Sequence, residues 1–306
     1  MGRIEKKVEM AIKLSPKRIE KVKNNFLRRV IYGCMAPYLI VRYPWLVKKY
    51  PLYLDYFEVV VTTRCSLRCK NCANLMQYYQ QPQHVEFEVI EKSLKQFIEN
   101  VDLVKRVGVL GGEPFLYKEL DKVLSILSSS KKIEKIRVVT NGTIIPNEET
   151  LKALKLPKVV VQLNCYMNAY YEKVDEIVTI FEKNGIKYQL LKKEGTEWMD
   201  YGNLEHRGRS EKELEEQFSK CRIDCRSLFN GKIFYCPRSG HGMDLNLLPH
   251  TEQDYVDLMD SQLSRKELRY RIFELMFEKK YIEACNHCNK GTNNCKIIPA
   301  GEQLGR

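Results

Sequence analysis

The chain has 306 residues, of which 44% are hydrophobic, and its formal net charge is +12. A hydrophobic fraction of this size is typical of a globular protein with a buried core. No apolar run reaches the roughly 18–20 residues needed to span a bilayer, and the N-terminus lacks the pattern of a secretory signal. We therefore expect a cytoplasmic protein whose 11 cysteines stay reduced and act as metal or cluster ligands where their spacing is short.

The positive charge is concentrated near the N-terminus. The first 50 residues hold 13 Lys and Arg against three Glu, a net +10, which leaves +2 for the rest of the chain. A near-neutral body disfavours nucleic-acid binding. We interpret residues 1–56 as a basic, aromatic segment with helical spacing over 16–31. It suits either contact with an anionic membrane surface or a helix that packs on the core with its charged face in water.

Alternating strand and helix patterns begin near residue 57. Strands are predicted at 57–63, 106–110, 135–140, 158–163 and 187–191, and helices at 86–100, 117–128, 147–155 and 169–184. Repeated units of this kind wind in a right-handed manner around parallel strands. The expected fold class is therefore α/β, and with a sixth unit residues 57–200 form a partial (β/α)6 TIM-like barrel. Functional residues of such sheets lie at the C-terminal ends of the strands.

Three cysteines stand directly after the first predicted strand. Cys65, Cys69 and Cys72 have the spacing C-x3-C-x2-C. Thiolates are the usual ligands of iron–sulfur clusters. Three ligands leave one iron of a four-iron cluster with an open position, which distinguishes a reactive metal site from a structural one. The alternative is a zinc site completed by a fourth ligand such as His84.

This cysteine spacing at the end of a first strand resembles the signature of the radical S-adenosylmethionine (radical SAM) superfamily. The resemblance implies a 4Fe-4S cluster whose open iron binds SAM. It also implies reductive cleavage of SAM to a 5′-deoxyadenosyl radical, which abstracts a hydrogen from the substrate. The protein then positions this chemistry and excludes side reactions. Asn71 departs from the family, which usually has an aromatic residue before the third cysteine, close to the adenine.

Other strand ends carry residues that the same resemblance assigns to SAM. Glycines let a backbone approach a ligand closely, and a carboxylate can accept charge-assisted hydrogen bonds from the SAM ammonium. Ordinary capping of strand ends is the alternative for the polar positions. The SAM-binding positions implied, which include the family's GGEP run, are Gly111, Gly112, Glu113, Pro114, Thr140, Asn141, Gln162 and Asn164. Cys165, which follows them, is either a hydrogen donor to a substrate radical or a small buried apolar residue.

Six further cysteines lie after residue 200. The arrangement Cys-x9-Gly-x4-Cys followed by Cys-x2-Cys resembles the auxiliary-cluster segments called SPASM and twitch. Six cysteines are too few for the two clusters of a full SPASM domain, so residues 201–306 are interpreted as a linker and a twitch-like domain with one auxiliary 4Fe-4S cluster. A zinc ribbon is the alternative. The expected ligands are Cys221, Cys236, Cys285 and Cys288, with Cys225 and Cys295 as alternates.

The sequence gives fewer indications of the substrate than of the cofactors. The ending 298–303, after a Cys-x2-Cys pair, resembles radical SAM proteins found with polysaccharide-assembly enzymes. We therefore expect oxidation, epimerisation or dehydration of a sugar or nucleotide-sugar, with flavodoxin or ferredoxin as electron donor. The alternatives are a radical SAM maturase of a ribosomal peptide and a zinc-stabilised binding protein without catalysis. Arg238 and His241 either bind a substrate phosphate near the auxiliary cluster or lie in a solvated loop.

Overall fold

The computed structural model describes residues 38, 41–42, 48–166, 171–192, 197–221 and 223–305. The chain divides into two compact units, 1–53 and 54–306, and the fold described below is that of the second. The predicted helix over 16–31 and most of the basic segment lie outside the described residues, so membrane contact stays a prediction. Among the helices of the described part of the chain, none has the length and apolar character needed to cross a bilayer.

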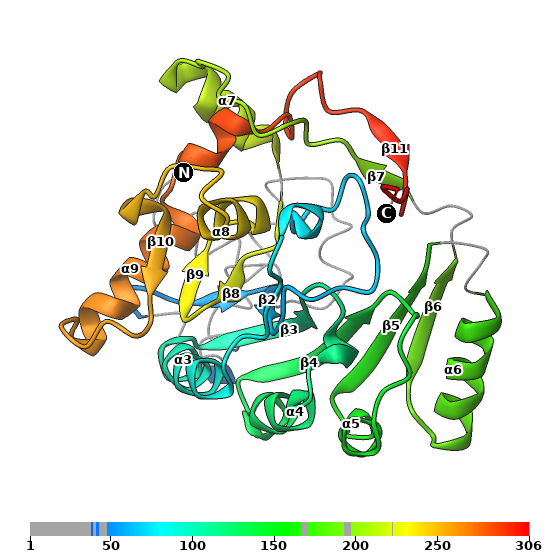
Figure 1. The fold of residues 1–306 in the computed structure, drawn as a ribbon. Coiled ribbons are helices and arrows are strands. Elements are labelled where there is room, and N and C mark those ends of the chain that lie inside the picture. The colour runs from blue at the N-terminus through cyan, green and yellow to red at the C-terminus, as the bar shows by residue number, and fades with distance from the viewer. Residues whose placement is uncertain are drawn as a thin grey trace. The chain divides into compact units, whose positions relative to one another are not determined.

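A twisted sheet forms the centre of the second unit (Figure 1), with the strand order β10-β9-β8-β2-β3-β4-β5-β6. The two-residue strand β1 (Tyr53–Leu54) precedes these strands in the chain. The strands from β2 to β6 are parallel and adjacent in chain order, as repeated β/α units require. The path consists of β2 (Phe57–Val60), β3 (Leu103–Leu110), β4 (Ile133–Thr140), β5 (Val159–Cys165), β6 (Tyr188–Lys192), β8 (Ser227–Phe229), β9 (Lys232–Phe234) and β10 (Tyr255–Asp257).

Helices cover one face of the parallel strands (Figure 1). They are α3 (Phe87–Asn100), α4 (Leu120–Ser129), α5 (Glu148–Leu154) and α6 (Tyr171–Lys183). Their apolar residues recur at helical spacing, as Ile90, Leu94 and Phe97 do in α3, and these side chains are buried. The ring of Phe97 stacks on that of Phe57 in β2 at 4.0 Å between centroids. Burial of each such ring contributes about 1.5–3 kcal/mol to stability, which fixes the helix on the sheet.

The predicted α/β fold with parallel β/α units is confirmed, and the largest differences in strand limits are in the first and second strands. The first strand ends at Val60 instead of residue 63, because the following residues pair with the segment before α3. There Val85 N donates to Val61 O at 3.0 Å. The second strand begins earlier, at Leu103. Within the described residues the sheet stays open, with β6 and β10 at its two edges.

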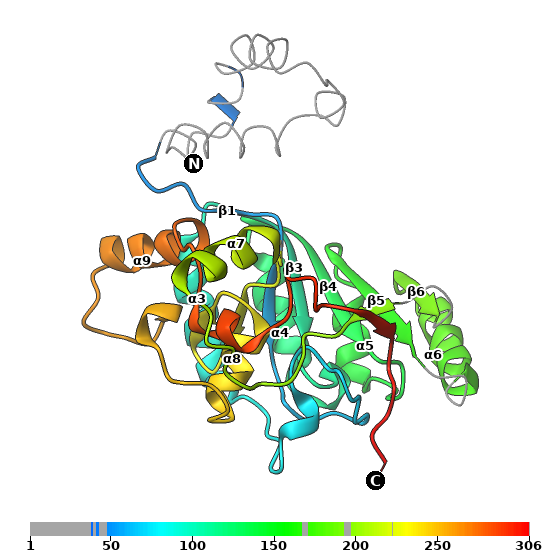
Figure 2. The same ribbon diagram turned by 90° about the horizontal axis from the view of Figure 1, so that it is seen from above.

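The C-terminal third extends the same sheet. β8 is parallel to β2, and β9 and β10 follow antiparallel. Positive φ angles of 46° at Asn230 and 77° at Gly231 form the tight hairpin between β8 and β9, a turn in which Asn-Gly is favoured. The helices here are α7 (Glu211–Cys221), α8 (Pro237–Asp244) and α9 (Arg265–Phe277). In Figure 2, α9 lies at the opposite end of the sheet from α6.

Short elements complete the fold on the face of the sheet away from α4 and α5 (Figure 1). The strands β7 (Glu197–Met199) and β11 (Ile297–Pro299) form a separate antiparallel pair there. Within the described residues, four 3-10 turns connect the longer elements, namely η2 (Met76–Tyr78), η3 (Pro114–Leu116), η5 (Glu252–Asp254) and η6 (Glu283–His287). These pieces lie among the loops that carry the predicted site residues.

Candidate active site

A cavity of about 630 Å³ lies on the sheet face that the helices leave uncovered. Its volume falls within the range of roughly 300–1,000 Å³ that is usual for small-molecule sites. The structure brings most of the predicted cluster and SAM residues to its wall. Those that line it are Cys65, Cys69, Cys72, Gly111, Gly112, Thr140, Asn141, Gln162 and Asn164. Glu113, Pro114 and Cys165 are not among the lining residues.

The two glycines hold the cysteine loop against the end of β3. Gly112 N donates to Thr62 O at 2.8 Å, and Glu113 N donates to Arg64 O at 2.8 Å. A Cβ atom at Gly111 would collide with the carbonyl oxygen of Thr62, and one at Gly112 with that of Arg64. Only glycine permits this backbone contact, which places Cys65 beside the strand end.

Each thiol of the first cysteine group receives hydrogen bonds or lies near donors. Asn141 Nδ2 is 3.6 Å from Cys65 Sγ, and Gln303 Nε2 donates to Cys69 Sγ at 3.0 Å. Backbone amides after Cys72 lower its pKa against the larger effect of burial, which raises it. Burial also raises the pKa of the Cys65 thiol to about 12 and that of Cys69 to about 11. Metal binding deprotonates such buried thiols, and N–H donors stabilise the resulting thiolates, so the donor set fits an iron–sulfur cluster.

His84 is not placed to act as the fourth ligand of a zinc site at Cys65, Cys69 and Cys72. Its Nδ1 atom is 2.9 Å from Thr62 Oγ1, and the residue lines a different cavity from the three thiols. His84 is held in this position by the bridge between its own segment and Thr62. The structure therefore separates this histidine from the first cysteine group.

Glu113 is buried and hydrogen-bonded within the protein, and its expected contact with the SAM ammonium stays a prediction. Its side chain is 0% exposed, and its carboxylate accepts hydrogen bonds from Phe115 N at 3.1 Å, Thr140 Oγ1 at 2.8 Å and Asn141 N at 2.8 Å. Burial raises its pKa to about 7, and these three donors oppose that rise. Glu113 thus ties the GGEP loop to the turn after β4, where it positions Asn141 on the cavity wall.

The C-terminal segment packs on the first cysteine loop, which the sequence did not reveal. Arg68 N donates to Gln303 Oε1 at 2.8 Å, and Leu304 N donates to Arg68 O at 2.9 Å. These bonds place the Gln303 amide on Cys69 Sγ. Hydrogen bonds to ligand sulfur atoms tune a cluster's reduction potential. The only available signal was the likeness of residues 298–303 to other proteins, and it does not indicate this contact.

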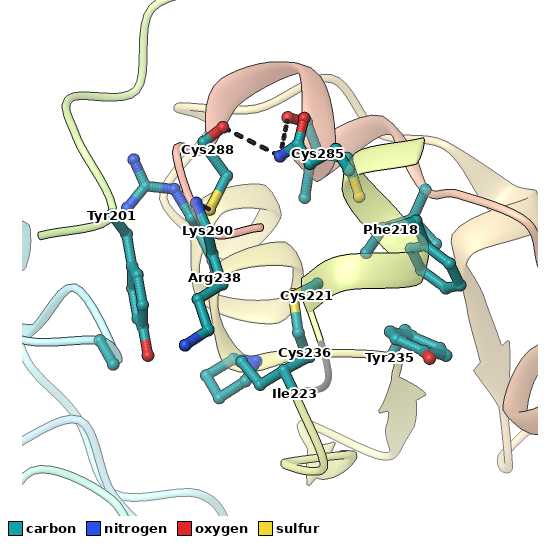
Figure 3. A pocket seen from close by; sticks show the side chains of 15 residues that line it. Tyr201, Phe218, Cys221, Ile223, Tyr235, Cys236, Arg238, Cys285, Cys288 and Lys290 are labelled. Carbon is teal, nitrogen blue, oxygen red and sulfur yellow. Dashed lines mark hydrogen bonds between the residues drawn. The ribbon is translucent and has the colours of Figure 1, made fainter. Parts of the chain in front are cut away.

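The four expected auxiliary ligands surround a second, small cavity of about 40 Å³ (Figure 3). Cys221 ends α7, Cys236 precedes α8, and Cys285 and Cys288 belong to or follow η6. Burial raises the pKa of Cys285 to about 12 and also raises that of Cys236, whose thiolate the Ser239 backbone amide stabilises. Four partly buried cysteines from three separate elements therefore line one small cavity.

Two polar side chains fix the loop between Cys285 and Cys288. Gln217 Nε2 donates to both of their carbonyl oxygens at 3.0 Å, as the dashed lines in Figure 3 show. Arg209 Nη1 donates to the same two oxygens at 2.8 and 2.9 Å. The alternates lie elsewhere, since Cys225 lines the large cavity and Cys295 lines neither.

The two cavities adjoin each other. Ala73, Tyr201 and Lys290 line both of them. Ala73 directly follows Cys72, and Lys290 N donates to Cys288 Sγ at 3.3 Å. The two cysteine groups therefore face a shared wall, an arrangement that suits electron transfer between a substrate and a second cluster.

Arg238 and His241 contact other parts of the protein, which corrects the solvated-loop reading of the sequence. Neither is in a solvated loop, because both lie in the buried helix α8. Arg238 donates to the carbonyl oxygens of Gly202 at 2.7 Å, Asn203 at 2.6 Å and His287 at 3.0 Å. His241 is 1% exposed, and burial lowers its pKa to about 3. The bonds of Arg238 hold the auxiliary region together, and phosphate binding by these two residues stays a prediction.

The sequence analysis also missed the inner strand positions of the large cavity. Glu58 in β2, Arg106 in β3 and Arg137 in β4 line it, together with Tyr56. Each charged residue interrupts an otherwise apolar strand, and that was the available signal. The strand register needed to show that they face the same space comes only from the structure.

Comparisons with known proteins agree with this geometry. Residues 59–187 match the family profile described as Radical SAM superfamily. GTP 3′,8-cyclase from Clostridium acetobutylicum is 30% identical over 131 residues, which are 42% of this chain and 41% of that protein. GTP 3′,8-cyclase from Helicobacter pylori is 29% identical over 148 residues, 47% of this chain and 44% of that protein. The chain thus spans less than half the length of these curated relatives.

One similar solved structure is that of BtrN in complex with AdoMet and 2-DOIA. It covers 82% of this chain and 97% of its own, with a TM-score of 0.50 and 14% sequence identity. At that identity the likeness concerns the fold alone.

Residues 59–187 thus form a radical SAM domain, as the Cys65–Cys72 spacing predicted. That domain implies a 4Fe-4S cluster and S-adenosylmethionine as cofactors.

Proposed function

We propose that this radical SAM enzyme oxidises, epimerises or dehydrates a sugar or nucleotide-sugar in the large cavity. The observation that supports it best is that the three thiols and the polar strand ends line one space of about 630 Å³. SAM held at the cluster supplies the radical that removes a hydrogen atom from the substrate. The same space has room for a substrate beside SAM.

Different residues around the cavity bind different parts of the cluster and of SAM. Cys65, Cys69 and Cys72 hold the cluster, and the polar ends of β4 and β5 offer hydrogen bonds to the amino-acid and ribose parts of SAM. Asn71 offers no aromatic surface for the adenine. Tyr166 and Trp198 line the same cavity, with ring centroids 5.2 Å apart, and we assign the adenine contact to them.

The auxiliary site serves electron transfer in this proposal. Cys221, Cys236, Cys285 and Cys288 hold a second 4Fe-4S cluster, because their thiols line one cavity that adjoins the first. A cluster held by these four thiols would supply an acceptor for one electron from a substrate radical, which favours oxidation. A flavodoxin or ferredoxin supplies the electron that SAM cleavage consumes.

The proposed division into a radical SAM core over 57–200 and an auxiliary region over 201–306 follows the two cysteine groups. Hydrogen donation by Cys165 stays a prediction. This residue ends β5 and is 1% exposed, whereas Cys225 lines the large cavity. The cavity geometry therefore favours Cys225 if the reaction needs a thiol donor.

Deuterium transfer tests the substrate class. Ring-deuterated nucleotide-sugars are incubated anaerobically with the cluster-loaded enzyme, SAM and dithionite, and 5′-deoxyadenosine is analysed by mass spectrometry. The proposal predicts deuterium in 5′-deoxyadenosine from one ring position of one sugar. Transfer from a deuterated peptide, with none from any sugar, would contradict it in favour of a peptide maturase.

A further inference from the structure

We propose that Arg106 and Arg137 form a subsite for a phosphate group of the substrate, deep in the large cavity. This inference rests on the proposed function, because it assigns a substrate class to the same cavity. It selects phosphorylated or nucleotide-activated sugars over neutral ones.

The two arginines come from adjacent parallel strands. In the register of β3 and β4, Arg106 is opposite Lys135 and Arg137 is opposite Gly108, so the two arginines are two positions apart along the sheet. Both are partly buried and line the cavity, whereas Lys105 and Lys135 on the same strands are exposed. Alternation along β3 directs Lys105 to the face opposite Arg106, whereas Lys135 shares the face of Arg137 nearer the start of β4, where it is exposed.

Neither arginine has an acidic partner among the described residues, because no ion pair there involves Arg106 or Arg137. Arg106 Nε is buried and has no hydrogen-bond partner, and its guanidinium lies over the Tyr56 ring at 5.1 Å. Arg137 Nη1 donates to Gln162 Oε1 at 2.9 Å. Burial lowers the pKa of Arg137, and the charge of Arg106 lowers it further. An anion between the two guanidinium groups would relieve this repulsion.

Glu58, which lines the same cavity from the neighbouring strand β2, does not supply that anion. It is 5% exposed, and its Oε2 atom accepts no hydrogen bond within the described structure. Burial raises its pKa to about 7, and the groups that oppose this rise are Cys225 and Tyr56, with neither arginine among them. The carboxyl group therefore faces a thiol and a phenol, and the arginine charges stay available to a ligand.

The depth of the pair separates it from SAM. Arg137 is three residues before Thr140 at the end of β4, and Arg106 is four before Leu110 at the end of β3. At about 3.3 Å per residue, the pair lies about 10 Å below the strand ends that face the cluster loop. SAM is anchored at the open iron, so its carboxylate stays near those ends. A second molecule reaches the arginines, and guanidinium forks match phosphate geometry well.

Pyrophosphate binding tests the subsite. Inorganic pyrophosphate is titrated calorimetrically into anaerobic, cluster-loaded enzyme with SAM, and glucose serves as the neutral probe. We expect pyrophosphate to bind and glucose not to bind. The affinity for pyrophosphate should fall about 10-fold to 100-fold in Arg106→Gln and in Arg137→Gln. Lys105→Gln is the matched control, because Lys105 is exposed on the same strand as Arg106 and faces the other way, and this variant should bind as the wild type does.

Two outcomes overturn the inference: pyrophosphate does not bind the wild type, or both arginine variants bind it as tightly as the wild type. Arg137→Lys, which keeps the charge and loses the fork, should bind with intermediate affinity. A glutamine variant that loses both pyrophosphate binding and the iron–sulfur absorbance is misfolded, and Arg137→Lys is then the deciding variant. If Arg137→Lys keeps the cluster and binds pyrophosphate with wild-type affinity, the guanidinium subsite is contradicted. Failure of the wild type to cleave SAM is a separate readout and would instead contradict the proposed function.

Discussion

The two cysteine groups are built in opposite ways. Cys65, Cys69 and Cys72 lie in one loop, whose shape depends on glycines at the neighbouring strand end. The auxiliary thiols come from α7, the start of α8 and η6, which lie far apart in the chain. Donors contact sulfur atoms in both groups, and in the second group Gln217 and Arg209 also fix backbone carbonyls. Three ligands leave one position of a metal site open, and four ligands close it.

Removing one thiol from each group gives the largest contrast. We expect Cys65→Ala to abolish the formation of 5′-deoxyadenosine from SAM and dithionite, because the cluster loses a ligand that nothing replaces. Cys285→Ala should retain part of this cleavage and lose substrate turnover. Cys295→Ala is the control, since this thiol lines neither cavity. Full turnover by Cys285→Ala, measured by chromatography and mass spectrometry, would show that the second group has no catalytic part.

Glu113 gives the next largest effect, on the stability of the first site. Glu113→Ala leaves the amides of Phe115 and Asn141 and the hydroxyl of Thr140 without their acceptor in a buried place. Each such loss costs about 1–3 kcal/mol, so the unfolding free energy should fall by about 3 kcal/mol or more. Thermal unfolding of the anaerobic protein measures this. Glu149→Ala, an exposed pair with Lys152, should change it by less than about 1 kcal/mol.

The pH dependence of stability should reveal Glu58. Burial raises its pKa from an ordinary 4.5 to about 7 in the folded state. A carboxyl group with a raised pKa stabilises the fold most below its unfolded pKa, and this contribution is lost as the pH rises through about 7. The unfolding free energy of the wild type should therefore fall between pH 5 and 8. In Glu58→Gln this fall should be smaller by roughly 1–3 kcal/mol. Unfolding curves of Glu91→Gln, an exposed control, should keep the wild-type slope; an unchanged slope in Glu58→Gln would contradict the raised pKa.

Gln303 gives the smallest expected effect, confined to the first cluster. Gln303→Leu removes the hydrogen bond to Cys69 Sγ, so the reduced cluster should lose stabilisation and its reduction potential should become more negative. SAM cleavage should slow by about 10-fold. A redox titration followed by electron paramagnetic resonance measures the shift. Glu302→Gln, which changes an exposed partner of Lys70, should leave the potential unchanged.

The sequence predicted best what is local. The apolar, β-branched segments of β3, β4 and β5 indicated a parallel sheet, and C-x3-C-x2-C needs no distant partner. It could not predict that β8 adds to β2, or that Gln303 reaches Cys69, because these contacts join segments far apart in the chain. The sequence also could not show which way the Glu113 side chain points, because a carboxylate at a strand end can face either a ligand or the neighbouring turn.

Iron and sulfide analysis of anaerobically prepared protein, combined with electron paramagnetic resonance, tests the central claim most directly. The account predicts about eight iron and eight sulfide per chain for two four-iron clusters, and a reduced signal that changes when SAM is added. Zinc bound at Cys65, Cys69 and Cys72, with no iron and no response to SAM, would contradict it.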